Sequence, residues 1–461
     1  MNTEEMTEPV RKENKMGVLP IGKLLVSMSV PMMLSMLVMA LYNIVDSIFV
    51  SWISEKALTA VSLAFPVQNL MIAFAVGAGV GLNSILSRRL GEKNDQAVNR
   101  AAGNGFVLFF GMYLIFLLFG LFFTGVFFTA QTSDPEILEA GVQYLTICCL
   151  FSFGSFGQIA CERMLQSTGK TVFAMATQLI GSVVNLVLDP IFIFGLGPIP
   201  AMGVSGAALA TVTGQIVAMA SALLMNIKLN REIQFKLSYL RPHWGTIKDI
   251  CTVGVPSIVM QSIGSVMTFG LNKILMSFTS TATAVFGVYF KLQSFVFMPV
   301  FGLNNGLVPI VSYNYGAGHK ERIQKTIRLS MILALAIMLV GTAVFQIFPG
   351  ALLSFFKPSE AMIAIGIPAL RLISVSFVFA GISIIAGSVF QALGNGMLSL
   401  MISIVRQLVV LLPAAWLLGQ SGNVDLVWLA FPVSEIVAMI LSAALLVRIS
   451  KRQISKIGIE A

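Results

Sequence analysis

FPVQNLMIAFAVGAGVGLNSILSRRLG, residues 65–91, is followed 225 positions later by FKLQSFVFMPVFGLNNGLVPIVSYNYG, residues 290–316. The same displacement places the whole of residues 31–100 on a second copy without a gap. A repeat of this length defines an architecture, so the chain consists of two similar halves. The matched pairs are Pro31 and Pro256, Phe65 and Phe290, Gln68 and Gln293, Gly77 and Gly302, Gly81 and Gly306, Ser87 and Ser312, Gly91 and Gly316, Gln166 and Gln391, and Gly169 and Gly394.

The composition indicates that both halves lie in a membrane. Apolar residues make up 57% of the chain and charged residues 11%, whereas soluble domains carry about 25% charged residues. Twelve apolar runs are long enough to cross a hydrocarbon core of about 30 Å. We expect spans at 24–50, 60–86, 103–128, 138–162, 171–194, 203–227, 249–275, 284–311, 329–350, 367–391, 397–418 and 425–447.

These spans predict an all-α integral membrane protein whose twelve helices form two pseudo-symmetric six-helix lobes. We expect an N-terminal tail at 1–23, an N-terminal lobe at 24–227, an inter-lobe linker at 228–248, a C-terminal lobe at 249–447 and a C-terminal tail at 448–461. Two repeated membrane bundles are typical of secondary transporters, in which one half rocks against the other.

The net charge of +9 is distributed in a way that predicts the topology. If the N-terminus is cytoplasmic, 23 of the 29 Lys and Arg residues lie on the cytoplasmic side, in the tails and loops. This positive-inside bias predicts a multi-pass cell-membrane protein with both termini in the cytoplasm. Nucleic-acid binding would need one contiguous basic face, so we expect no nucleic-acid partner.

The cysteines and histidines give no sign of an enzyme. All four cysteines fall within predicted spans, and no pair has metal-ligand or redox spacing. No His-Asp or His-Glu constellation suggests a catalytic site at a membrane face. We therefore expect no enzymatic activity and no cofactor. We expect contacts with membrane lipids. Because nothing in the sequence indicates a dimer, we expect a monomer.

Two acidic residues within predicted spans are the strongest functional candidates, because an ionised side chain near the bilayer centre costs roughly 2.5–3.5 kcal/mol on insertion scales. Asp46 lies about 33 Å along the first span and Asp189 about 27 Å along the fifth, at 1.5 Å per residue. Asn185 shares a helix face with Asp189, and Thr211 in the sixth span returns to similar depth. These oxygens suit a small hard cation such as Na+, and the same carboxyl groups would equally suit a shared proton.

The repeat serves as an internal control for this cluster. The displacement of 225 places Leu271 opposite Asp46, Val410 opposite Asn185 and Ala414 opposite Asp189. A displacement near 220, anchored by IVAM at 216 and again at 436, places Phe431 opposite Thr211. The C-terminal half lacks the cluster. This one-sidedness indicates that the polar residues serve a function rather than hold the fold together.

Two prolines in spans that carry these acids are candidates for helix bending. Pro190 follows Asp189 and deprives the carbonyl of Leu186 of its usual hydrogen bond. Pro31 lies in the first span. Proline also bends membrane helices without any functional motion, so a moving part and a static kink are both compatible with the sequence.

At these residues the chain resembles the multidrug and toxic compound extrusion (MATE) family. The resemblance covers essentially the whole chain and rests on Asp46, NLVLDP at 185–190, GAALAT at 206–211 and the paired turns QSTGK at 166–170 and QALGN at 391–395. It is closer to the DinF and MepA-like branch than to NorM. The resemblance implies export of cationic amphipathic drugs against H+ or Na+, with Asp46, Asn185, Asp189 and Thr211 as the coupling-cation site.

The substrate cavity is predicted less sharply. Lys273, Lys291 and Arg406 introduce buried positive charge into the second lobe, which fits a purely cationic substrate poorly. Glu162 is expected to stay hydrated at the inner end of the fourth span. An exporter of an anionic or zwitterionic metabolite, a lipid-linked oligosaccharide flippase and a passive channel therefore remain as alternatives. Candidate cavity residues are Tyr42, Asn43, Gln68, Gln158, Gln178, Gln261, Gln293 and Glu435.

Overall fold

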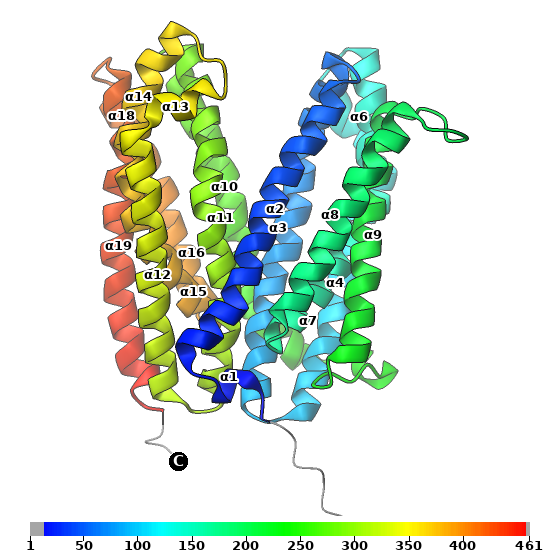
Figure 1. Cartoon of the computed structure of the whole chain (residues 1–461), viewed down its shortest axis with the longest axis vertical. Coiled ribbons are helices and arrows are strands. Elements are labelled where there is room, and N and C mark those ends of the chain that lie inside the picture. Colours follow the sequence, from blue (N-terminus) through cyan, green and yellow to red (C-terminus); the bar gives the residue numbers. More distant parts are fainter. Residues whose placement is uncertain (1–12, 458–461) are drawn as a thin grey trace, which may run out of the picture.

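The structure is a computed structural model that describes residues 13–457, and these fold almost entirely into helices (Figure 1). The N-terminal half contains α1 Lys15–Val18, α2 Ile21–Ser51, α3 Glu55–Gly91, α4 Asp95–Phe122, α5 Thr124–Thr129, α6 Pro135–Leu150, α7 Phe153–Ser167, α8 Thr171–Phe194 and α9 Gly203–Leu229. After the short 3-10 helix Leu237–Leu240, the C-terminal half contains α10 Trp244–Met276, α11 Ser280–Gly316, α12 Lys320–Ile347, α13 Pro349–Ser354, α14 Glu360–Ser374, α15 Ser376–Ala392, α16 Gly396–Ile404, a π-helical turn Val405–Leu411, α17 Leu412–Gly419, α18 Val424–Trp428, α19 Ala430–Ile449 and a second π turn Ser450–Ile454.

Twelve membrane spans form two lobes. In the described residues, ten spans are single long apolar stretches, and the bent pairs α6–α7 and α14–α15 bring the number to twelve. The expected fourth and tenth spans are present, but each is bent, by 42° and 44°. At the two breaks, Ser152 Oγ donates to the Cys149 carbonyl (2.8 Å) and Ser376 Oγ to the Ile373 carbonyl (2.6 Å). Serine hydroxyls that bond back to the helix compete with its own ladder and favour a bend.

The two lobes, α2–α9 and α10–α19, meet through a pseudo-twofold contact between small residues. A Cβ at Gly302 would lie 2.5 Å from the Met33 backbone, and one at Gly77 would lie 2.5 Å from the Ile258 backbone. Met33 and Ile258 are themselves 225 positions apart, so each half presents the same surface to the other, as in a two-fold interface. The other matched pairs are Gly306 on Ser29 with Gly81 on Gly254, and Gly316 on Arg88 with Gly91 on Tyr313.

The repeat also appears in hydrogen bonds within each lobe. Ser87 Oγ donates to the Ser167 carbonyl (3.1 Å), and its counterpart Ser312 Oγ donates to the Ala392 carbonyl (2.9 Å). The turns that follow contain Gly169 and Gly394, both at φ +85°, a left-handed conformation that glycine adopts without strain. The predicted matched tight turns are therefore confirmed.

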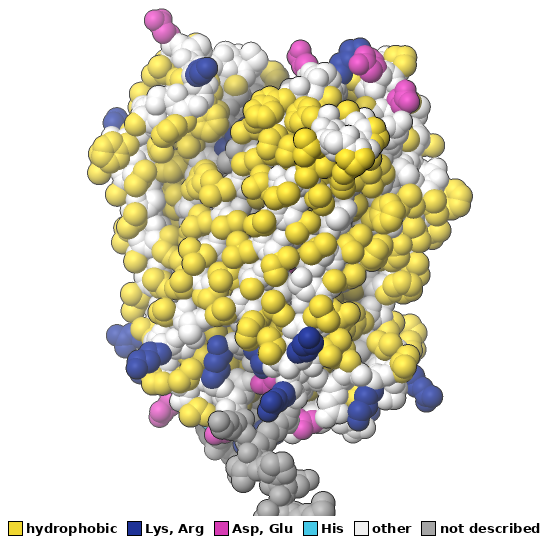
Figure 2. All heavy atoms as spheres, turned by 45° about the vertical axis from the view of Figure 1, so that its right-hand side comes forward, with side chains coloured by type: hydrophobic (Ala, Val, Ile, Leu, Met, Phe, Trp, Pro, Cys, Tyr) yellow, Lys and Arg dark blue, Asp and Glu magenta, His cyan; other side chains and the backbone are white. Residues whose placement is uncertain are grey.

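The molecule has two distinct ends and an apolar girdle. Figure 2 shows hydrophobic side chains covering the broad middle of the surface and Lys and Arg side chains gathering near the lower end, where Figure 1 places α1 and the C-terminal end of α19. We call this the basic end and the other the opposite end. The paired glycines hold the lobes together toward the basic end, and the helices of the two lobes diverge toward the opposite end (Figure 1).

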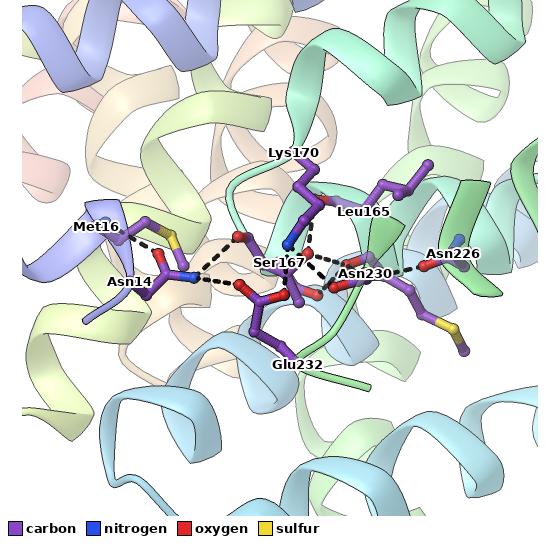
Figure 3. A network of polar contacts seen from close by, with 10 residues as sticks. Asn14, Met16, Leu165, Ser167, Lys170, Asn226, Asn230 and Glu232 are labelled. Carbon is purple, nitrogen blue, oxygen red and sulfur yellow. Dashed lines mark hydrogen bonds and ion pairs between the residues drawn. The ribbon is translucent and has the colours of Figure 1, made fainter. Parts of the chain in front are cut away.

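The N-terminal segment is bound to the N-terminal lobe at the basic end (Figure 3). Asn14 Nδ2 donates to the Thr168 carbonyl (3.0 Å) and to Glu232 Oε1 (3.2 Å). Glu232 also forms an ion pair with Lys170, whose ammonium group donates to Asn230 Oδ1 (3.3 Å). The loops after α7 and α9 are thus joined to the chain that leads into α2.

The same segment is bound to the C-terminal lobe. The carbonyl of Met16 accepts hydrogen bonds from Asn314 Nδ2 (3.1 Å) and Arg322 Nη2 (2.9 Å). Arg322 Nη2 also donates to the Leu19 carbonyl (2.8 Å). Because α1 contacts both lobes, it ties their basic ends together, and any separation of the lobes at this end must break one set of these bonds.

Candidate functional site

The site in the N-terminal lobe is set by the register of α2 and α8, which both start at the basic end and pack against each other. Near their middle, Ser35 Oγ donates to Gln178 Oε1, and Gln178 Nε2 lies 3.3 Å from Met39 Sδ. Asp46 and Asp189 each follow eleven residues further along their helix. Parallel helices in register therefore bring the two acids to the same level.

The carboxyl groups of Asp46 and Asp189 are hydrogen-bonded to each other. A carboxylate only accepts hydrogen bonds, so this contact requires one of the two groups to carry a proton. Asp189 is fully buried, and among the described residues Asp46 Oδ1 is buried without a hydrogen-bond partner. The pair thus places two adjoining carboxyl groups, one of them with an unsatisfied acceptor, inside the lobe.

Asn185 connects this pair to α9. Its amide nitrogen lies 3.4 Å from Asp189 Oδ1 and 3.3 Å from Thr211 Oγ1. With the amide turned over, the nitrogen donates to Asp189 Oδ2 (3.2 Å) and the oxygen accepts from the Thr211 backbone N–H (3.0 Å), which satisfies both ends. Gly181 and Gly214 let α8 and α9 approach closely here, because a Cβ at Gly214 would lie 2.9 Å from Asn185 Cβ.

The structure therefore brings together all four residues that the sequence singled out. Two carboxyl groups, a carboxamide and a hydroxyl form a set of hard oxygen donors, which suits a proton or Na+. The described residues contain no group of three or more His, Cys, Asp or Glu side chains of the kind that holds a metal ion. Tyr42, half-buried one turn before Asp46, contacts the Thr211 hydroxyl and extends the polar cluster.

The prolines of α2 and α8 lie inside continuous helices. Pro31 frees the carbonyl of Ser27 from the helix ladder, and that carbonyl instead accepts a hydrogen bond from Thr171 Oγ1 of α8 (3.3 Å). Pro190 lies within α8, directly after Asp189. That α8 itself satisfies the carbonyl released by Pro31 was not predictable from the sequence.

The corresponding place in the C-terminal lobe has a different chemistry. Leu271 is fully buried and Phe431 nearly so. Between the eleventh and twelfth spans, Arg406 Nη1 donates to Glu435 Oε1 (3.0 Å), and both side chains are largely buried, with 24% and 13% exposed. Arg406 lies in the π turn Val405–Leu411. The sequence singled out both residues separately but did not pair them, since they lie on different helices 29 positions apart.

The other candidate cavity residues fall into two groups. Gln68 Nε2 donates to the Tyr144 hydroxyl (3.1 Å), and Gln158 Nε2 donates to Glu162 Oε1 (2.9 Å), so both link helices or turns within the N-terminal lobe. Gln261 is exposed on α10 and Gln293 is half-buried on α11. Asn43 lies outside the side chains that the structure describes.

Two expectations about charged residues are wrong. Glu162 is buried rather than hydrated, because α7 packs beneath α9, while the neighbouring Arg163 turns away and donates to Asn305 Oδ1 of the other lobe (2.8 Å). Lys273 and Lys291 are exposed rather than buried. Of Lys273, Lys291 and Arg406, only Arg406 is largely enclosed.

A two-lobed bundle of twelve membrane helices with a carboxyl site inside one lobe is the architecture of a secondary transporter. The MatE family model matches residues 31–191 and 256–417, one segment in each half. The chain therefore belongs to the MATE family and is a membrane transporter rather than an enzyme.

Relatives and solved structures match nearly the full length. A Shewanella oneidensis protein named FAD transporter is 26% identical, with 90% of this chain and 92% of that protein covered. The multidrug export protein MepA of Staphylococcus haemolyticus is 25% identical, with 95% and 97% covered. A structure described as the outward-facing conformation of a multidrug resistance MATE transporter superposes with a TM-score of 0.89 at 27% identity, with 96% and 100% covered.

Proposed function

We propose that this transporter is a secondary active exporter that exchanges cationic amphipathic drugs for H+ or Na+ by alternating access. The hydrogen-bonded pair Asp46–Asp189, buried in one lobe only, is the observation that carries the proposal. The C-terminal lobe has the same fold with Leu271 and Ala414 at the corresponding positions. The fold therefore does not require the two carboxyl groups. The resemblance to a multidrug export protein supports the choice of substrate.

In this proposal, Asp46, Asn185, Asp189 and Thr211 bind the coupling cation. A proton would bind between the two carboxyl groups, whereas Na+ would displace it and bind the carboxyl, amide and hydroxyl oxygens. Binding from the outside changes the contact between α2 and α8, and bending near Pro31 and Pro190 moves α2 against the substrate. Drug leaves outward, the lobes rock, and the cation leaves inward.

The basic end is the cytoplasmic side in this proposal, so both termini lie in the cytoplasm and the divergent ends of the lobes face outward. The gathering of Lys and Arg side chains at this end supports the assignment. The boundary between the lobes falls in the linker 228–248, which joins α9 to α10. The lobes then close inside through α1 and the paired glycines and open outside.

Gradient-driven efflux of ethidium from proteoliposomes tests the function. Vesicles receive a pH gradient alone, a Na+ gradient alone or neither, with wild-type protein and with Asp46→Asn. Efflux driven by one gradient and lost in the variant supports the proposal and names the ion. Efflux equal in all three conditions would overturn ion coupling, and translocation of a lipid probe in its place would indicate a flippase.

A further inference from the structure

The C-terminal wall of the space between the lobes carries two lysines that the cation site does not use. Lys291 on α11 and Lys273 on α10 are both exposed. Among the described residues, no carboxylate forms an ion pair with either, whereas Arg406 in the same lobe is paired with Glu435. An unpaired charge inside a membrane domain is costly unless it faces water or a ligand.

Lys291 points toward the N-terminal lobe. It lies eleven residues before Gly302 on the same helix, which at 100° per residue places it within about 20° of the direction of Gly302. Gly302 packs against Met33 of α2, so this direction is the inter-lobe direction. The opposite face of the same segment, with Phe286, Tyr289 and Leu292, is buried in its own lobe.

Lys291 lies within the membrane-spanning part of α11 rather than at the membrane surface. It lies eleven residues from the start of α11 at Ser280, hence about 16 Å inside the helix at 1.5 Å per residue. Measured from residue 284, where the expected span begins, Lys291 lies about 10 Å inside a hydrocarbon core of about 30 Å. Where the lobes diverge, Lys291 therefore faces the other lobe from within the membrane-spanning part of α11.

Lys273 extends this positive wall on the neighbouring helix. Phe269 lies eleven residues after Ile258, and Ile258 contacts Gly77 of the other lobe, so Phe269 continues the inter-lobe face of α10. Its ring is 65% exposed, and the Lys273 ammonium lies 5.3 Å from the ring centroid. An exposed aromatic ring with a cation above it presents an apolar surface beside a positive charge.

Among the described residues, the acid pair Asp46–Asp189 does not supply the counter-charge across this space. Asp189 is buried inside the N-terminal lobe between α2 and α9, and Asp46 is hydrogen-bonded to it. The N-terminal lobe thus directs these two acids inward, while the C-terminal lobe directs Lys291 and Lys273 toward the inter-lobe space. A ligand between the lobes meets positive charge on one wall.

We propose that Lys291 and Lys273 form an anion subsite, so that the transported molecules include amphipathic compounds with a carboxylate, sulfonate or phosphate group, either anionic or zwitterionic. The anionic group binds at Lys291, and the apolar part lies against Phe269 and Phe295, which is 42% exposed one turn from Lys291. This inference rests on the proposed exporter function and widens its substrate class from cationic drugs to anionic and zwitterionic compounds.

Binding of two dyes of opposite charge tests the subsite. Fluorescein is the anionic probe and ethidium the cationic probe, and anisotropy is measured with the purified full-length protein for wild type, Lys291→Gln, Lys273→Gln and Lys56→Gln. Lys56 is an exposed lysine outside the inter-lobe space and serves as the control for loss of one charge. We expect Lys291→Gln to weaken fluorescein binding about tenfold, as loss of one charge-assisted hydrogen bond does, and Lys273→Gln to weaken it less.

Ethidium binding should be unchanged or stronger in both variants, and Lys56→Gln should alter neither dye. Fluorescein binding that is absent in wild type, or equal in wild type and Lys291→Gln, would overturn the subsite. Gradient-driven ethidium efflux, measured on the same proteins, decides the exporter function separately. Wild-type efflux without an effect of Lys291 on fluorescein would leave the exporter standing and remove the subsite.

Discussion

The fifth and sixth spans of the N-terminal lobe and their counterparts in the C-terminal lobe share a fold but not a chemistry. In the first pair, Asn185 lies within hydrogen-bonding distance of Asp189 and Thr211. Asp46 of α2 completes the cluster by contacting Asp189. In the second pair, Arg406 and Glu435 neutralise each other. One lobe therefore holds the acid pair that we propose as the cation site, and the other holds an ion pair at the corresponding spans. In the proposed function, the duplicated fold separates ion binding from the remaining tasks of transport.

Removing either acid should have the largest effect. Asp46→Asn and Asp189→Asn should each reduce gradient-driven efflux of ethidium to the level of protein-free vesicles, because an amide cannot exchange the proton or supply the charge that Na+ needs. The variants should remain folded in the membrane, since the asparagine side chain fills the same space. Glu360→Gln, which neutralises an exposed acid of the other lobe, is the control, and normal efflux by both aspartate variants would remove the proposed site.

The ion pair of the C-terminal lobe should affect stability rather than coupling. Arg406→Met and Glu435→Gln should each lower the free energy of unfolding by about 3 kcal/mol, because each variant leaves a buried charge without its partner. The double variant Arg406→Met with Glu435→Leu should recover most of that loss and still respond to the ion gradient. Thermal unfolding and efflux of the three variants measure this. Loss of the gradient response in the double variant would show that the ion pair takes part in coupling, which would contradict the proposed difference between the lobes.

Asn185 and Thr211 should tune the affinity for the cation. Asn185→Ala and Thr211→Val should each weaken it about fivefold, because a single hydrogen bond or ligand contact contributes about 1 kcal/mol. Val410→Ala changes the residue that corresponds to Asn185 in the other lobe and should lower stability without changing ion dependence. Efflux measured over a series of ion concentrations distinguishes these cases, and equal shifts in both lobes would contradict the assignment.

The smallest effect is expected at the opposite end of the molecule. Asp134 caps α6 and pairs with Lys56 (3.1 Å), whereas its counterpart Ser359 caps α14 without any charge. Lys56 lowers the pKa of Asp134, so the pair stabilises the fold above the unfolded-state pKa of about 3.9. That contribution disappears as the pH falls through the lower folded pKa. Lys56→Gln should lower the melting temperature slightly at pH 7 and leave efflux unchanged, and the difference from wild type should vanish once the pH is below the lowered pKa of Asp134.

The fold was predictable to the extent that it follows from repetition and hydropathy. Twelve apolar runs and a displacement of 225 predict two six-helix lobes, and small residues at matched positions agree with the pseudo-twofold contact. The breaks at Ser152 and Ser376 were not predictable, because a serine within a membrane helix bonds back without bending it in many other places, such as Ser62 and Ser257. The surrounding packing decides between the two outcomes.

The candidate site shows the same division. Asp46 and Asp189 stood out because acids in apolar spans are rare, and depth along each helix was enough to place them together. The pairing of Arg406 with Glu435, the burial of Glu162 and the exposure of Lys291 depend on how each helix is rotated about its axis. That rotation comes from contacts between residues far apart in sequence, which periodicity within one span does not specify.

Competition between the cation and the drug tests the account most directly. Ethidium affinity of the purified protein is measured at several pH values and Na+ concentrations for wild type and for Asp46→Asn. Because binding linkage is reciprocal, protons or Na+ should weaken ethidium binding to wild type and have no effect on the variant. Wild-type affinity that stays constant across all pH values and Na+ concentrations would contradict the claim that the acid pair couples the ion to export.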